Sequence, residues 1–148
     1  MFQGVLALDH TAVAVRSIES VLPFYRDLLG GKIVHESTPA GKGYRFLQLT
    51  YPNGAKVEIL EPVGEDSFLH PFLEKRGEGV HHLTYIVKDL KEAVEAARAA
   101  GFRVVGESYA NPSWQEAFIH PRDNHGTLVQ LAAKAGDSAT APDCSAAR

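Results

Sequence analysis

Hydrophobic and polar residues alternate in several short runs of this chain, a pattern typical of strands with one buried face. Leu8 to Val15 places Leu, His, Ala and Ala on one face and Asp, Thr, Val and Val on the other. A helical pattern follows over Ile18–Leu29, with Ser17 as its predicted cap and Gly30 as its left-handed stop. Three further strands are then predicted, over Lys32–Glu36, Tyr44–Thr50 and Lys56–Leu60, with a hairpin turn at Pro52-Asn53-Gly54.

The second half of the chain repeats this order of elements. Asp89 and Glu92 have the spacing of a capping box at the start of a helix predicted over Leu90–Ala100, and Gly101 ends that helix. The strands predicted after it are Arg103–Ser108, Glu116–His120 and Thr127–Leu131. Residues 61–80 join the halves and are predicted to contain a short helix around Pro71–Lys75. Each half therefore reads βαβββ.

Ligand-type side chains recur at one offset within this repeat. A separation of 72 residues relates His10 to His82 and Glu58 to Gln130. The same offset relates Phe46 to Phe118 and Gly54 to Gly126, which indicates duplicated architecture. Two imidazoles, one carboxylate and one amide oxygen form a plausible ligand set for a divalent metal. We therefore expect a metal site between two half-domains, with His81 facing away from it because His81 aligns with Asp9.

The length of 148 residues fits a single domain. We expect that domain to span residues 1–133, as a first module of about 7–62, a linker over 63–79 and a second module of about 80–133. Residues 134–148 are rich in Ala, Ser and Asp without periodicity, and we expect them to form a disordered tail.

Composition excludes several classes of function. A net charge of −3 gives no support for a nucleic-acid surface. No apolar run approaches the roughly 20 residues needed to cross a bilayer, and the start of the chain lacks the pattern of a secretory signal. The only cysteine is Cys144, which excludes an internal disulfide framework. These features predict a cytoplasmic protein with a small-molecule substrate.

The paired βαβββ modules, with His near the start and Glu or Gln near the end, resemble the vicinal oxygen chelate superfamily over residues 7–133. That superfamily includes glyoxalase I, methylmalonyl-CoA epimerase, fosfomycin-resistance enzymes and extradiol dioxygenases. The runs Phe72 to His82 and Phe118 to Pro121 are most similar to the epimerase branch. The resemblance implies an α+β fold whose curved mixed sheets form an open cup, and a homodimer. It also implies one divalent ion (Co, Ni, Mn, Zn or Fe) held by His10, Glu58, His82 and Gln130.

The chain departs from the epimerase pattern at both acid–base positions. Epimerases resembling this chain use two Glu residues, and the corresponding positions here hold Gln130 and Phe46. Neither an amide nor a phenyl ring acts as a general base. We therefore expect Glu116 or His120 to transfer the proton, with Tyr44 as a hydroxyl donor. The substrate-contacting residues are expected to be Phe46, Gln48, Phe118 and Trp114.

The resemblance implies a metal-dependent epimerase or isomerase that stabilises the enolate of an acyl-CoA or a related carbonyl substrate. Three alternatives remain open at this point. They are a glyoxalase I-like lyase, a non-catalytic ligand-sequestering protein of the bleomycin-resistance type, and a non-haem Fe dioxygenase. In the dioxygenases the carboxylate ligand comes from the last strand, where this chain carries Gln130.

Overall fold

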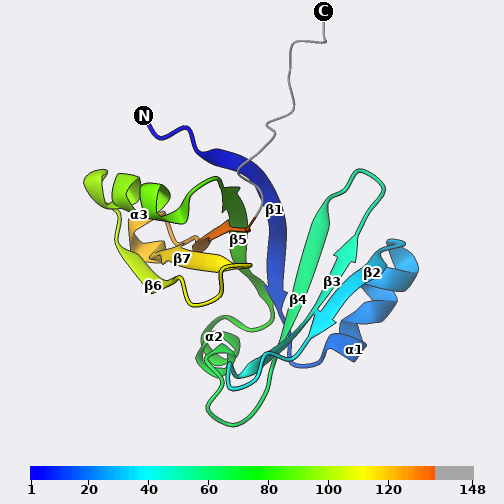
Figure 1. Cartoon of the computed structure of the whole chain (residues 1–148). Coiled ribbons are helices and arrows are strands. Elements are labelled where there is room, and N and C mark those ends of the chain that lie inside the picture. Colours follow the sequence, from blue (N-terminus) through cyan, green and yellow to red (C-terminus); the bar gives the residue numbers. More distant parts are fainter. Residues whose placement is uncertain (136–148) are drawn as a thin grey trace, which may run out of the picture. The chain divides into compact units, whose positions relative to one another are not determined.

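The computed structural model describes residues 1–135 and has a mixed α+β fold (Figure 1). The elements are, in order, β1 (Val5–Ala14), α1 (Ile18–Leu22), the π-helical turn η1 (Pro23–Leu28), β2 (Lys32–Ser37), β3 (Tyr44–Thr50), β4 (Lys56–Pro62), α2 (Leu69–Arg76), β5 (Gly79–Val87), α3 (Leu90–Ala99), β6 (Val104–Ser108), β7 (Gln115–Ile119), the 3-10 turn η2 (Pro121–Asp123) and β8 (Val129–Ala133). No helix among the described residues is long and apolar enough to span a membrane. Most of the predicted tail, including Cys144, lies outside the described residues.

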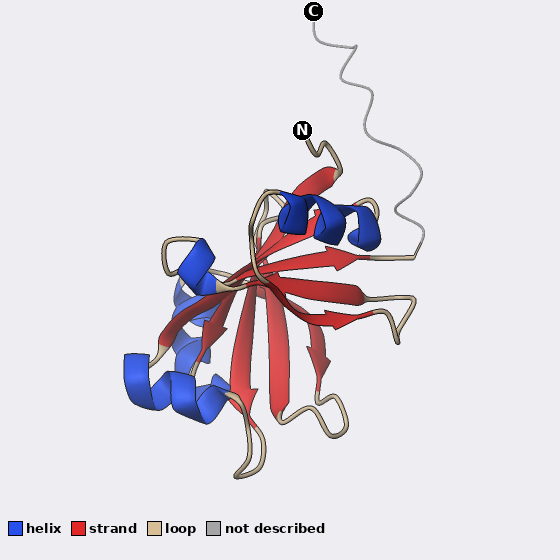
Figure 2. Cartoon of the chain, turned by 90° about the vertical axis from the view of Figure 1, so that its left-hand side faces the viewer, coloured by secondary structure: helices blue, strands red, loops and turns tan. Residues whose placement is uncertain are grey.

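The strand pairing confirms the duplicated βαβββ architecture. The strand order is β2-β3-β4-β1-β5-β8-β7-β6. Figure 2 shows the strands in red and the helices in blue. The first strand of each module pairs in parallel with the last strand, as β1 with β4 and β5 with β8. The other pairs within each module are antiparallel. The parallel pair is what brings the predicted ligand positions of one module onto neighbouring strands.

The chain divides into two compact units. The N-terminal unit is His10–His82, and the C-terminal unit combines Met1–Asp9 with the chain from Leu83 onward. The strands β1 and β5 each begin in one unit and end in the other.

The sheet of the N-terminal unit buries both faces. On one face, the side chains of Val13, Leu47, Leu49 and Ile59 pack against Ile18 of α1. On the other face, small residues of β1 and Leu60 of β4 pack against α2; the set is Ala12, Ala14, Leu60, Leu69 and Leu73. His10 and Glu58 share the second face because side chains alternate along each strand. The alternation predicted for Leu8 to Val15 thus separates the ligand-type residues from the α1 core.

The first predicted helix differs from the structure. A single helix is expected over Ile18–Leu29, but α1 stops at Leu22 and a π-helical turn continues to Leu28. Proline has no amide hydrogen to donate to the preceding turn, so Pro23 interrupts the α-helical ladder. The next amides bond five residues back, as Leu29 N does to Phe24 O at 3.0 Å.

Ser17 does not cap this helix with its side chain. Instead, the amide of Ile18 donates to the carboxylate of Glu61 at 2.6 Å. A glutamate distant in sequence has taken the role predicted for the adjacent serine. Gly30 has a φ of 74°, which confirms it as the left-handed residue that ends this segment.

The C-terminal unit follows its predicted local chemistry more closely. The amide of Glu92 donates to Asp89 Oδ1 at 2.8 Å, so Asp89 is the cap of α3. One face of α3, which lies along β7 (Figure 1), packs against strand residues; the cluster is Val87, Leu90, Ala93, Val94, Ala117 and Ala133.

His120 is not in a strand as predicted. It precedes Pro121 and caps η2, where its Nδ1 accepts from Arg122 N at 3.2 Å. The strand β7 ends at Ile119, since proline removes the ladder donor that would follow.

The two predicted caps make a matched pair for a stability test. We expect Asp89→Ala to lower the free energy of unfolding by about 1 kcal/mol, because one amide of the first helical turn loses its acceptor. Ser17→Ala should change it by less than about 0.5 kcal/mol, because Ser17 makes no capping bond. Urea denaturation of both variants checks this, and equal losses would contradict the assignment of the caps.

Candidate metal centre

Three ligand-type side chains converge in the N-terminal unit. They are His10 on β1, Glu58 on β4 and His82 on β5, and one ligand atom from each lies within 4.8 Å of the others. His10 Nε2 is 3.6 Å from Glu58 Oε1. The rings of His10 and His82 are edge-on, with centroids 5.9 Å apart. His10 is 3% exposed and His82 is 6% exposed, so this His–Glu–His cluster is largely withdrawn from solvent.

The sheet register explains why the three side chains meet. In the parallel ladder Ala12 pairs with Glu58, and His10 lies two residues before Ala12 on the same face. His82 reaches the cluster from β5, which neighbours β1 in the sheet. The methyl side chain of Ala12 takes up little volume on this face, which leaves room for the three larger groups.

The carboxyl group of Glu58 is held in its charged form. Burial acts to raise the pKa of Glu58, but hydrogen bonding to His10, aided by the nearby His10 charge, more than offsets it. Gln48 Nε2 also donates to Glu58 Oε2 at 2.6 Å, and His82 acts in the same direction, so the net pKa of Glu58 is lowered. A carboxylate, rather than a carboxylic acid, therefore faces the two imidazoles at neutral pH.

The donor set fits a small divalent metal ion. Two imidazoles and a carboxylate are the groups that Zn, Co, Ni, Mn or Fe accept in proteins. Ligand atoms that share one ion at about 2.1 Å lie roughly 3.0–3.4 Å apart in tetrahedral or octahedral geometry. The 3.6 Å separation of His10 Nε2 and Glu58 Oε1 is close to that value. One ligand atom of each of the three side chains lies within 4.8 Å of the others, so all three side chains surround one small volume.

Gln130, the fourth predicted ligand, lies in the C-terminal unit and is 6% exposed. Its Oε1 accepts from Thr84 Oγ1 at 2.7 Å, and its Nε2 donates to Glu116 Oε2 at 2.6 Å. These two bonds fix which end of the amide is oxygen, since a carboxylate only accepts. The amide oxygen has a second lone pair beyond the one that Thr84 occupies. Gln130 as a metal ligand stays a prediction.

Comparison with known proteins agrees with the α+β fold and shows the family of this chain. Residues 9–118 match the family model of the Glyoxalase/Bleomycin resistance protein/Dioxygenase superfamily. The chain belongs to this superfamily.

Epimerases are prominent among its similar proteins. The chain is 35% identical to the ethylmalonyl-CoA/methylmalonyl-CoA epimerase of Cereibacter sphaeroides, over 84% of this chain and 95% of that protein. The crystal structure of methylmalonyl-CoA epimerase from Mycobacterium tuberculosis is 31% identical, with a TM-score of 0.82 over 93% of this chain and 94% of that one. A variant of the Streptomyces coelicolor methylmalonyl-CoA epimerase, solved with 2-nitronate-propionyl-CoA, is 29% identical. It has a TM-score of 0.78 over 89% of this chain and 99% of that one.

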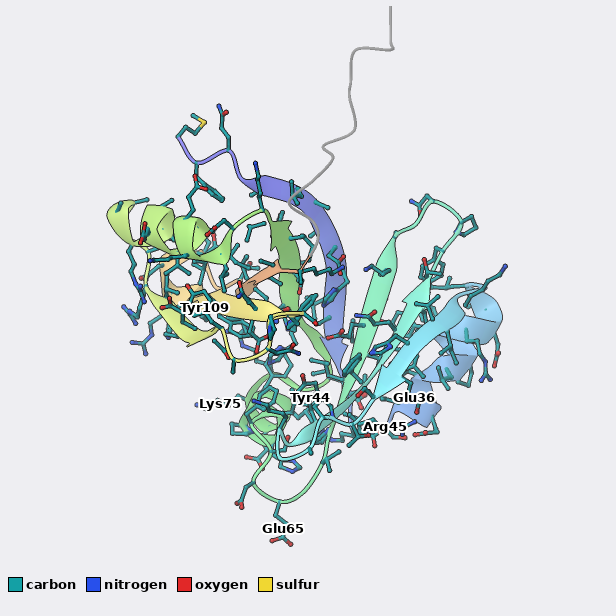
Figure 3. All side chains as sticks on the ribbon, in the orientation of Figure 1. Glu36, Tyr44, Arg45, Glu65, Lys75 and Tyr109 are labelled. Carbon is teal, nitrogen blue, oxygen red and sulfur yellow. The ribbon has the colours of Figure 1, made fainter. Side chains whose placement is uncertain are left out.

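Beside the cluster, this superfamily member carries a row of larger side chains on β3. Tyr44, Phe46 and Gln48 alternate onto the face that Glu58 shares, and the rings of Tyr44 and Phe46 are 6.1 Å apart. The role of Gln48 as a donor to Glu58 has a signal in the sequence, since paired strands place cross-strand neighbours in contact. Arg45, which lies between Tyr44 and Phe46, forms ion pairs with Glu36 and Glu19, each at 2.8 Å. Figure 3 labels Arg45 and Glu36 next to each other.

The remaining residues predicted for catalysis or substrate contact lie in the C-terminal unit. They are Trp114, Glu116, Phe118 and His120. Trp114 Nε1 donates to Glu116 Oε2 at 3.1 Å, so two donors meet the same carboxylate oxygen. Phe118 stands opposite Gln130 in the ladder. His120 does not join this group of hydrogen bonds through Nδ1, because that atom accepts from the Arg122 amide.

The 72-residue offset slips by two positions in the ladder of β7 and β8. Gln48 is opposite Glu58, so the offset predicts His120 opposite Gln130, whereas the structure places Phe118 there. The cause is the connection between these strands, which spans residues 120–128, compared with 51–55 between β3 and β4. As a result Glu116, opposite Ala132, holds the ladder position that Phe46, opposite Leu60, holds in the first module.

The charged hydrogen bond between Gln48 and Glu58 predicts a measurable energetic coupling. With chelator present, Gln48→Leu should lower the free energy of unfolding by about 1–3 kcal/mol, because a largely buried carboxylate loses a donor. In a Glu58→Leu background the same change should be nearly neutral. A double-mutant cycle from urea denaturation gives the coupling energy, and a value near zero would contradict the interaction.

Proposed function

We propose that this chain is a divalent-metal-dependent epimerase of the methylmalonyl-CoA epimerase type, acting on an acyl-CoA or a closely related carbonyl substrate. The observation that carries the proposal is the convergence of His10, Glu58 and His82 within 4.8 Å, in a chain similar to such epimerases over most of its length. A protein that only sequesters a small molecule does not need these metal-binding side chains.

The ligands proposed for the metal are His10, Glu58 and His82, with Gln130 as the fourth. A divalent ion supplies Lewis acidity, which stabilises negative charge on a carbonyl oxygen next to the reacting carbon. The protein's part is to keep Glu58 ionised and both imidazoles in place. The four proposed ligands together carry a charge of −1, from Glu58, so a divalent ion would keep a net charge of +1. A glutamate in place of Gln130 would add a second negative charge and make the site less electrophilic.

Glu116 is the group that we propose for proton transfer. It is a half-buried carboxylate, and the donors Trp114 and Gln130 hold its Oε2 in a fixed position. His120, the alternative predicted for proton transfer, is less suited because its Nδ1 already accepts a hydrogen bond from the Arg122 amide. Tyr44 stays the predicted hydroxyl donor.

The proposed substrate class is that of the similar proteins. The similar proteins named above are epimerases of methylmalonyl-CoA or ethylmalonyl-CoA, and one was solved with 2-nitronate-propionyl-CoA. We propose the same acyl-CoA class here, with Phe46, Gln48, Phe118 and Trp114 as contacts for the acyl group. A homodimer remains the expected assembly.

Metal binding is the first test of this proposal. Isothermal titration of chelator-treated protein with Co, Ni, Mn and Zn should give one ion per chain. His10→Ala should weaken binding by at least about 100-fold, because one of the four proposed protein donors is lost. His125→Asn, a change at an exposed histidine outside the cluster, should leave binding unchanged. A folded wild-type protein that binds none of these ions would overturn the metal-dependent proposal.

Proton exchange is the test of the reaction. The metal-loaded protein should exchange the α-proton of methylmalonyl-CoA for deuterium in deuterated water, as followed by NMR. Glu116→Gln should slow this exchange by about 100-fold or more, because an amide cannot accept the proton, while metal affinity stays within a few-fold.

Two outcomes would redirect the proposal. Unchanged exchange in Glu116→Gln would remove Glu116 from the mechanism. Turnover of a glutathione hemithioacetal, without exchange on acyl-CoA esters, would favour the lyase alternative.

A further inference from the structure

His81 lies beside the cluster and makes a direct contact with one of its members. Adjacent residues of a strand normally point to opposite faces of a sheet. On β5, however, His81 Nδ1 lies 2.8 Å from His82 Nδ1, within hydrogen-bond distance. This contact occupies Nδ1 of His82, and the other ring nitrogen, Nε2, is buried.

Only one proton arrangement of this pair is compatible with metal binding. A neutral imidazole has one nitrogen that donates and one that accepts. If His81 Nδ1 donates, His82 Nδ1 is the acceptor and His82 carries its proton on Nε2, which cannot then bind an ion. If His82 Nδ1–H donates to His81, the lone pair of His82 Nε2 is available. The acceptor at His81 Nδ1 therefore decides which tautomer of His82 is stabilised.

The surroundings of His81 keep its ring in position for this contact. The ring packs edge-on against Phe72 of α2, with centroids 4.8 Å apart, and against Phe68, with centroids 6.0 Å apart. Neither phenyl ring offers a strong acceptor or donor that would compete for His81 Nδ1.

We propose that His81 is a positioning residue for the metal centre: it accepts a hydrogen bond from His82 Nδ1–H and so presents His82 Nε2 to the ion. This inference rests on the metal site proposed above. Metal-bound histidines usually donate their second N–H to a carboxylate, a backbone carbonyl or water. Here the acceptor is a second imidazole supplied by the preceding residue.

Two substitutions separate the hydrogen bond from simple packing. In His81→Asn the amide oxygen takes the place of Nδ1 as an acceptor, whereas in His81→Leu an apolar side chain fills the space with no acceptor. The proposal predicts that His81→Leu weakens metal affinity by about 10–100-fold. His81→Asn should stay within a few-fold of the wild type. A packing role for His81 predicts the reverse order, because Leu packs better than Asn against Phe68 and Phe72.

The experiment measures Zn²⁺ affinity by competition with a chromophoric chelator, together with the visible spectrum of the Co²⁺-loaded protein. Thermal unfolding of each metal-free variant shows that it is folded. Loss of affinity and an altered Co²⁺ spectrum in His81→Leu, with both restored in His81→Asn, would support the proposal.

The remaining outcomes overturn it in distinguishable ways. Wild-type affinity in both folded variants, or equal losses in both, would overturn the role of His81 and leave the metal site standing. A wild-type protein that binds no ion would overturn the proposed function and this inference with it.

Discussion

The contact between Glu58 and His10 is the interaction on which the N-terminal unit depends most. A carboxylate withdrawn from water is costly unless opposite charge or hydrogen bonds replace its hydration. Here the replacement comes from His10 at 3.6 Å and from Gln48 at 2.6 Å. Both require the β1–β4–β3 register, since a slip of one residue would turn these side chains to the α1 face. The register and the ionised carboxylate therefore stabilise each other.

The C-terminal unit uses the same pairing of groups with the residue types exchanged. In the first module the carboxylate is on the last strand, as Glu58, and the amide is on the preceding strand, as Gln48. In the second module the amide is on the last strand, as Gln130, and the carboxylate is on the preceding strand, as Glu116. Both contacts are 2.6 Å long. The duplication has kept an amide-to-carboxylate hydrogen bond in each half, although it has not kept which strand carries the charge.

Sequence patterns predicted the features that depend on local chemistry. Alternation along β1 placed His10 with Ala12, the Asp89 cap was correct, and the 72-residue offset singled out the three residues of the cluster. The failures involve contacts between distant segments. Nothing near Ser17 indicates that Glu61 accepts from the Ile18 amide.

The ladder shift at His120 is a second such failure. It follows from the longer β7–β8 connection, whose effect on register appears only when the strands pair. The Nδ1 contact of His81 with His82 is a third, because strand alternation alone predicts opposite faces for neighbouring residues.

The division of β1 between the two units bears on the order in which the protein assembles. His10–His82 is a continuous stretch, so the N-terminal unit is complete once that stretch has left the ribosome. The C-terminal unit needs the first nine residues of the chain: Gly4 accepts from Lys88 N at 2.8 Å, and Asp9 pairs with Lys134 at 3.3 Å. The Asp9–Lys134 pair joins the two ends of the described chain, and closing so long a loop is entropically demanding. The division falls between Asp9 and His10, so the first histidine of the cluster directly follows the segment that the C-terminal unit needs.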